Sequence, residues 1–153
     1  MGGAPLLYAA SQPGFSADCV VIASPFSSLP DMAVAGGLPR VLAFIMPDVW
    51  NNVRAVRTVR TPMMWVHSRS DTTIPIGSGR EVYDAKPTAK TAIIVAGFKH
   101  NAIYQQTPEA IWRPIVAFVR RMQTAHLLPR RSVALIRCSD TSFSENSKTT
   151  ASA

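Results

Sequence analysis

The chain has few cysteines and no arrangement of side chains typical of a metal site. Its two cysteines, Cys19 in an apolar run and Cys138 in a polar region, have surroundings too different to suggest a disulfide. We therefore expect a reducing, cytoplasmic compartment. No histidine has a second ligand at a metal-binding spacing, so we expect neither a metal nor another cofactor.

Two kinds of apolar segment are also absent. The N-terminus has no basic stretch followed by an apolar one, so no signal peptide is visible. The most apolar window, residues 32–50, is interrupted by Pro39, Arg40 and Asp48, which a membrane-spanning helix tolerates poorly. These absences exclude a transmembrane segment and leave peripheral membrane contact as the alternative to a purely cytoplasmic protein.

Acidic residues are scarce, with 9 Asp and Glu against 16 Lys and Arg, and the net charge is +7. Aromatic and basic residues are not interleaved, and no nucleic-acid module is present, so we expect no nucleic-acid partner. Arg54, Arg57 and Arg60 recur at a spacing of three, which would put them on one side of a helix. That side is either a solvated face or a contact with an anionic membrane surface.

The 153 residues, 47% of them hydrophobic, correspond to one packed domain at most. Residues 17–23, 63–66 and 91–96 are apolar runs without alternation, which is typical of strands buried on both faces. Segments of helical character lie between them. This order predicts an α/β fold with a parallel sheet and right-handed crossovers.

We expect helices over residues 3–11 and 77–85, and a last helix that begins at Thr107-Pro108 and closes at Arg120-Arg121. Residues 24–52 form an apolar excursion broken by prolines, which is either a cap over a pocket or packed connecting structure. Residues 1–122 are thus the expected domain, and residues 123–153 an expected disordered polar tail. The apolar face of the last helix would hold Ile111, Ile115, Phe118, Val119 and Met122.

Two residues are candidates for catalysis because each follows a predicted strand. Asp71 comes after residues 63–66, and His100 comes after residues 91–96. Parallel strands end at one edge of a sheet, so the two side chains can meet there, with the carboxylate orienting the imidazole. Taken singly, Asp71 is equally a turn-forming aspartate and His100 a surface histidine. We expect His67 to be structural and His126 to be exposed.

The N-terminus also carries a fragment of a motif. Met1-Gly2-Gly3 resembles the second half of a G-x-S-x-G nucleophile elbow, whose serine would stand one position before Met1. Gly2 and Gly3 would then allow the helix that leaves the elbow to pack closely against neighbouring strands. Ser78, in Gly77-Ser78-Gly79, lacks this pattern and follows the acid instead of preceding it.

These motifs together resemble the C-terminal portion of the α/β-hydrolase superfamily, in particular its serine aminopeptidase-like and prolyl-oligopeptidase-like members. The resemblance implies that Asp71 is the triad acid, His100 the general base and the Met1 backbone N–H an oxyanion-hole donor. The earlier strands, the second oxyanion donor and the nucleophile are not in the sequence, so we expect an incomplete sheet and a fragment inactive alone. The resemblance rests on residues 1–3, 61–71, 74–75, 97–101 and 112–118.

Several functions remain open at this point. The resemblance implies a serine hydrolase, and we slightly prefer an acyl ester or thioester substrate to a peptide or amide. The alternative is a non-catalytic protein that binds a partner or a membrane surface, and an incomplete coding sequence or a cleavage product is compatible with the first view. An unpaired apolar edge along residues 17–23 also predicts oligomers or aggregation.

Overall fold

The structure is a computed structural model that describes residues 3–100 and 108–127. Its centre is a three-stranded parallel sheet in the order β1-β2-β3, formed by β1 (Val20–Ala23), β2 (Met63–Ser68) and β3 (Lys90–Val95). Val20 pairs with Met63 and Met63 with Lys90, so the three strands run in register from one edge of the sheet to the other. The predicted parallel α/β sheet is confirmed.

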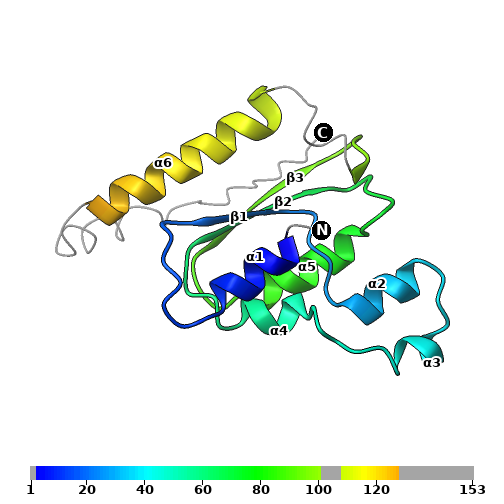
Figure 1. The fold of residues 1–153 in the computed structure, drawn as a ribbon. Coiled ribbons are helices and arrows are strands. Elements are labelled where there is room, and N and C mark those ends of the chain that lie inside the picture. Colours follow the sequence, from blue (N-terminus) through cyan, green and yellow to red (C-terminus); the bar gives the residue numbers. More distant parts are fainter. Residues whose placement is uncertain (1–2, 101–107, 128–153) are drawn as a thin grey trace, which may run out of the picture.

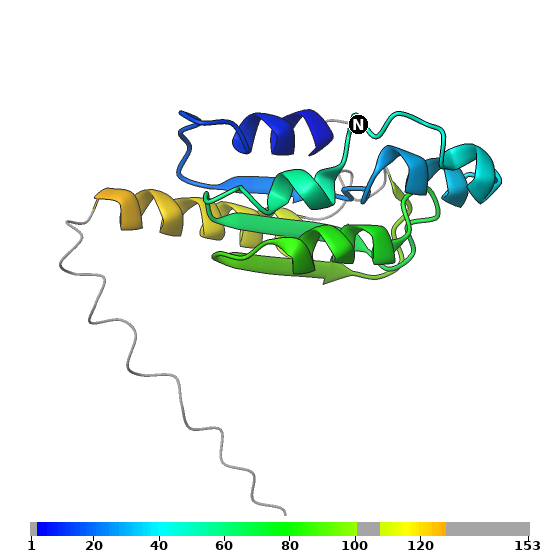
Figure 2. The ribbon, with the colours of Figure 1, turned by 90° about the horizontal axis from the view of Figure 1, so that it is seen from below.

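Helices cover both faces of this sheet. Figure 1 shows α6 (Arg113–Leu127) on one side, and α1 (Gly3–Ala10), α4 (Asn52–Val56) and α5 (Ile76–Ala85) on the other. The view in Figure 2, turned by 90°, shows the same three helices side by side across the strands. The result is a three-layered α/β/α arrangement.

The period of two along the strands separates the core into two clusters. Val20, Ile22, Met63 and Trp65 pack toward α1, α4 and α5, where Leu7 is completely buried. The alternate residues pack against α6 and the short π-helical segment η2 (Pro108–Trp112) that precedes it. This second cluster contains Met64, Val66, Ile111 and Phe118, with Val21, Ala23, Ile93 and Val95 partly buried beside them.

Burial on both faces is confirmed for the central strand only. All six residues of β2 are buried, whereas β1 alternates between buried and half-buried residues. Most of β3 is half-buried, and Ala92 is exposed. The difference follows from position, because β1 and β3 are the two edges of the sheet within the described residues.

The predicted helices largely agree with the structure. Helix α1 ends at Ala10, one residue before the predicted end, and α5 begins at Ile76, one residue before the predicted start. The last helix continues through Leu127, beyond both the expected close at Arg120-Arg121 and the domain boundary at residue 122. Gln123, Ala125 and Leu127 favour helix, and residues 115–127 contain no glycine or proline. Thr107 and residues 128–153 lie outside the described residues.

The excursion over residues 24–52 holds two short helices, α2 (Leu29–Ala35) and α3 (Arg40–Ala43). The Ser28 side chain caps α2 by accepting a hydrogen bond from the Asp31 N–H. Figure 1 shows that α3 lies farther from the sheet than α2. Beyond it the chain exposes large apolar side chains, among them Phe44 at 88% and Ile45 at 76%.

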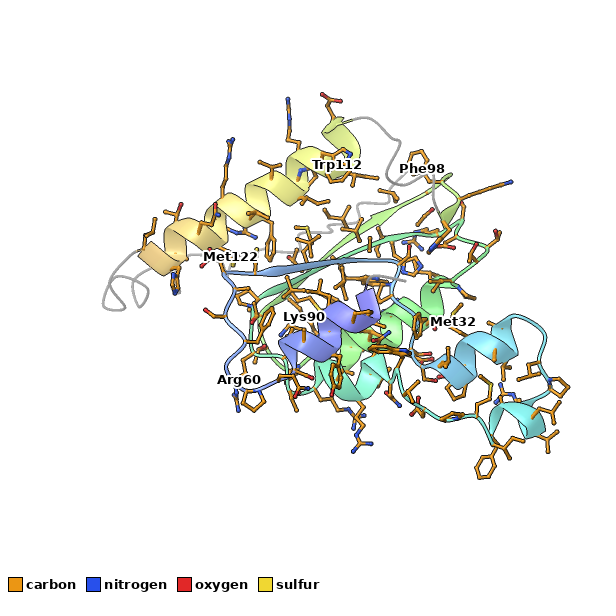
Figure 3. All side chains as sticks on the ribbon, in the orientation of Figure 1. Met32, Arg60, Lys90, Phe98, Trp112 and Met122 are labelled. Atoms are coloured by element: carbon orange, nitrogen blue, oxygen red, sulfur yellow. The ribbon has the colours of Figure 1, made fainter. Side chains whose placement is uncertain are left out.

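The three arginines do not share one helix. Arg54 lies within α4, Arg57 ends it and Arg60 lies beyond it, because α4 spans only residues 52–56. All three side chains are exposed. Figure 3 places Arg60 on the opposite side of the molecule from Met32 of α2. The expectation of a single helical stripe is therefore wrong.

Candidate active site

Asp71 lies just beyond the C-terminal end of β2, and its two carboxylate oxygens have separate partners. Oδ1 accepts hydrogen bonds from the N–H groups of Thr73 (3.0 Å) and Ile74 (2.9 Å), which closes a tight turn. Oδ2 lies 2.8 Å from Nδ1 of His100. Asp71 is therefore both the turn-forming aspartate and the partner of the histidine, so the two interpretations of this residue are compatible.

The loops after β2 and β3 are tied together, and this connection places His100. The Arg69 N–H donates to the Val95 carbonyl (2.8 Å), and the Gly97 N–H donates to Ser70 Oγ (3.0 Å). Gly97 has a φ of 83°, which places it in the left-handed region that glycine adopts without strain. Ser68 Oγ donates to the carbonyl of Phe98, which Figure 3 labels at the end of the sheet away from Met122.

The pair is partly closed off from solvent. The Asp71 side chain is fully buried, and that of His100 is 25% exposed. Burial alone would raise the pKa of Asp71. The hydrogen bonds from the Ile74 N–H, from His100 and from the Thr73 N–H instead hold that pKa below its usual value. Asp71 is thus a carboxylate at neutral pH.

His67 is completely buried and has a different set of contacts. The indole N–H of Trp65 donates to its Nδ1 (3.1 Å), so Nε2 carries the proton and donates to the Ile74 carbonyl (3.0 Å). Burial lowers its pKa and keeps the ring neutral. Its Nε2 also faces Oδ2 of Asp71 at 3.7 Å. These contacts agree with a structural role for His67, which supports the turn that holds Asp71.

Gly79, which we did not predict to matter, packs directly on His67. A Cβ at this position of α5 would lie 2.4 Å from His67 Nδ1 and 2.9 Å from Trp65 Nε1. Only a residue without a side chain fits between the helix and the two rings. The sequence gives no sign of this, because Gly77 stands in the same helix and meets nothing within 4 Å.

A cavity of about 560 Å³ lies beside His100, at the end of the sheet where the strands finish. Its walls come from α1, β1, the first part of the excursion and the η2–α6 segment, so both helical layers contribute. Most of the lining residues are apolar, and Thr73 adds a hydroxyl group. The residues that line it include Ala4, Leu6, Ile22, Phe26, Met32, Val66, Ile74, Ile111, Trp112 and Ile115.

The excursion borders this cavity only with its first part, from Ser24 to Met32. The segment that contains α3 does not line it.

His126, which we expected to be exposed, has a side chain 79% exposed and lies 3.4 Å from Asp18. Among residues 3–100 and 108–127, no cluster of three metal-ligating side chains is present.

The elbow motif is described only in part. Met1 and Gly2 lie outside the described residues, while Gly3 begins α1 and lines the cavity together with Ala4. A Cβ at Gly3 would meet no atom of the described chain within 4 Å. The close packing expected to require glycine is therefore absent at Gly3 among the described residues.

Within residues 3–100 and 108–127, every helix is too short or too polar to span a bilayer.

The chain matches no protein-family model and no curated protein. Its structure is similar to that of the acylaminoacyl peptidase of Pyrococcus horikoshii, with a TM-score of 0.57 and 14% identity over 80% of this chain. It is also similar to an acylaminoacyl peptidase in complex with Z-Gly-Gly-Phe-chloromethyl ketone, with a TM-score of 0.54, 13% identity and the same coverage of this chain. In both comparisons the chain spans 22% of the peptidase. The described residues thus have part of an α/β-hydrolase fold, as expected.

Proposed function

We propose that Asp71 and His100 are the acid and the general base of a serine-hydrolase triad. The observation that carries this proposal is the 2.8 Å contact between Asp71 Oδ2 and His100 Nδ1 at the edge of an apolar cavity. His100 Nε2 makes no hydrogen bond within the described residues, so it is available to a reacting hydroxyl. The proposal needs both nitrogens of one imidazole in these separate roles.

In this mechanism His100 Nε2 takes the proton of a serine hydroxyl as the oxygen attacks the substrate carbonyl. Asp71 stabilises the imidazolium that forms, and His100 then returns the proton to the leaving group. The nucleophile in the proposal is a serine immediately before Met1 in a longer chain. Ser78 does not serve, because its hydroxyl contacts Ser27 Oγ at 3.0 Å and its backbone is part of α5.

The cavity walls favour a substrate with an apolar acyl group. Its volume of about 560 Å³ falls within the range of small-molecule sites. Among the described residues that line it, His100 is the one with a basic or acidic side chain. We therefore propose an acyl ester or thioester as substrate, with a peptide or amide as the alternative.

A longer chain that restores G-x-S directly before Met1 tests the proposal. It should hydrolyse short p-nitrophenyl acyl esters, and His100→Ala should lower kcat/KM by about three to six orders of magnitude. His126→Ala is the matched control, since this side chain is exposed and contacts Asp18 instead of Asp71, and it should leave turnover unchanged. An active His100→Ala variant would contradict the proposal, and so would a fluorophosphonate probe that labels a serine within residues 1–153.

A second candidate function rests on the exposed apolar residues around α3. Val41, Phe44, Ile45 and Val49 are all more than half exposed. Arg40 begins α3, and Arg54 shares a shallow hollow with Val49, although Asp48 lines it too. Apolar side chains flanked by arginines suit the surface of an anionic membrane.

Sedimentation with lipid vesicles distinguishes this candidate from the hydrolase. The chain should bind vesicles that contain phosphatidylserine more strongly than vesicles of phosphatidylcholine alone, and Phe44→Ser with Ile45→Ser should abolish the binding. Leu127→Ser, which removes an exposed apolar side chain of α6 on the other face of the sheet, is the control. Equal binding by the double variant and the parent would exclude a membrane-binding role for the residues around α3.

A further inference from the structure

Ser24, at the end of β1, combines two unusual features. Its φ is 44°, and it is the one non-glycine residue of the described ranges with a positive φ. Pro25 follows it, and a proline normally drives the preceding residue to extended backbone. A serine held in the left-handed region before a proline is therefore strained on two counts.

The surrounding structure holds this conformation in place. The Ser24 N–H donates to the Val66 carbonyl (2.9 Å), which fixes the residue to the end of β2. Just beyond it, the side chain of Asn52 donates to the Phe26 carbonyl (2.8 Å), and the N–H of Ser27 donates to Ser78 Oγ (3.0 Å). These bonds leave the chain little freedom to relax at Ser24.

The hydroxyl of Ser24 is buried and makes no hydrogen bond of regular geometry, the one such side-chain atom among the described residues. Ser24 as a whole is 5% exposed. A buried hydroxyl without a partner is costly, so its retention needs an explanation. Because its oxygen is closed off from solvent, a molecule in the cavity cannot reach it without movement. Its partner must come from the protein.

The acceptor that the described residues offer is the carboxylate of Asp71, whose pKa the Ser24 hydroxyl helps to lower. Among residues 3–100 and 108–127, Oδ1 already accepts two N–H groups, while Oδ2 accepts only from His100 at 2.8 Å and faces His67 Nε2 at 3.7 Å. A carboxylate has about four acceptor positions, so one remains on Oδ2. We propose that Ser24 is a positioning residue whose hydroxyl donates to the Asp71 carboxylate and holds Oδ2 toward His100. The strained backbone is what brings the hydroxyl there, and the depressed pKa of Asp71 agrees with such a donor.

Carbon-13 NMR titration of Asp71, assigned with Asp71→Asn, tests this role in the full chain. Ser24→Ala and Ser24→Gly both remove the hydroxyl, and glycine also relieves the strain at φ 44°. In both variants the Asp71 titration should move to higher pH, and the His100 Nδ1 proton resonance should move upfield. The glycine variant should unfold at a higher temperature than the alanine variant, so it keeps the test available if alanine does not fold.

Ser28→Ala is the matched control, because Ser28 is a buried serine of the same segment whose hydroxyl contacts Asp31 instead. It should lower stability through loss of the α2 cap and leave the Asp71 titration unchanged. An unchanged titration in Ser24→Gly, or an equal shift in Ser28→Ala, would overturn the inference. A role of Ser24 in turnover rests on the proposed function, whereas this titration does not. Inactivity of the restored chain would therefore count against the proposed function alone.

Discussion

Adding one methyl group at Gly79 tests the packing behind the candidate site. The new Cβ would lie 2.4 Å from His67 Nδ1, and both His67 and Trp65 are buried, so neither ring has free space to move into. Overpacking of a core site costs about 1–3 kcal/mol, and loss of the bond between Trp65 and His67 adds about 1 kcal/mol. Alanine recovers about 1 kcal/mol of helix propensity. The net loss should be about 2 kcal/mol.

Gly77→Ala in the same helix is the control. Position 77 is exposed, and a Cβ there meets nothing within 4 Å, so alanine should stabilise the protein by up to about 1 kcal/mol. Urea unfolding followed by tryptophan fluorescence measures both free energies of unfolding. A Gly79→Ala protein as stable as the Gly77→Ala protein would refute the contact between α5 and His67, and with it the support of the Asp71 turn.

Three further expectations follow from the structure. Because the folded pKa of Asp71 lies below its usual value of about 4, the stability it contributes is complete above that pH and is lost as the pH falls through the folded pKa. In urea titrations the difference in free energy of unfolding between the parent and Asp71→Asn should therefore shrink in acid, and a difference independent of pH would contradict this. Lys86 is buried and donates to the Val59 carbonyl (2.8 Å). In urea unfolding, Lys86→Ala should lower the free energy of unfolding by about 2–5 kcal/mol and Lys86→Met by clearly less, and equal losses would show that the buried volume of this side chain is unimportant. Along β1 the N–H groups of Val20 and Ser24 pair with Pro62 and Val66, so those of Val21 and Ala23 point to the edge that no other described strand covers. Sedimentation velocity should therefore show association that increases with concentration rather than one monomeric boundary.

The three strands and most helix bounds could be predicted because the sequence patterns that specify them are local. Continuous apolar runs marked the three strands, and α1 and α5 began and ended within one residue of their predicted bounds. Since parallel strands end at one edge, the meeting of Asp71 and His100 could also be inferred from the sequence alone.

The features that were not predicted depend on contacts between distant segments. The approach of Gly79 to His67 needs the packing of α5 on β2, and the φ of Ser24 needs the bond to Val66. Neither leaves a periodic signal. The arginine spacing suggested one helical face, but α4 ends before Arg57 and separates the three side chains. The last helix ran past its expected end because charged residues alone do not stop a helix.

The effect of Asp71→Asn on turnover shows whether Asp71 and His100 act as the acid and base of a triad. The measurement is kcat/KM on a short acyl ester, in the longer chain with G-x-S restored before Met1. Asparagine cannot act as the charged acceptor for His100 Nδ1, so the imidazole loses the tautomer that a general base needs. We expect a loss of about four orders of magnitude, as for the same change in a serine-protease triad, in a protein that remains folded. A folded Asp71→Asn protein with undiminished turnover would contradict it.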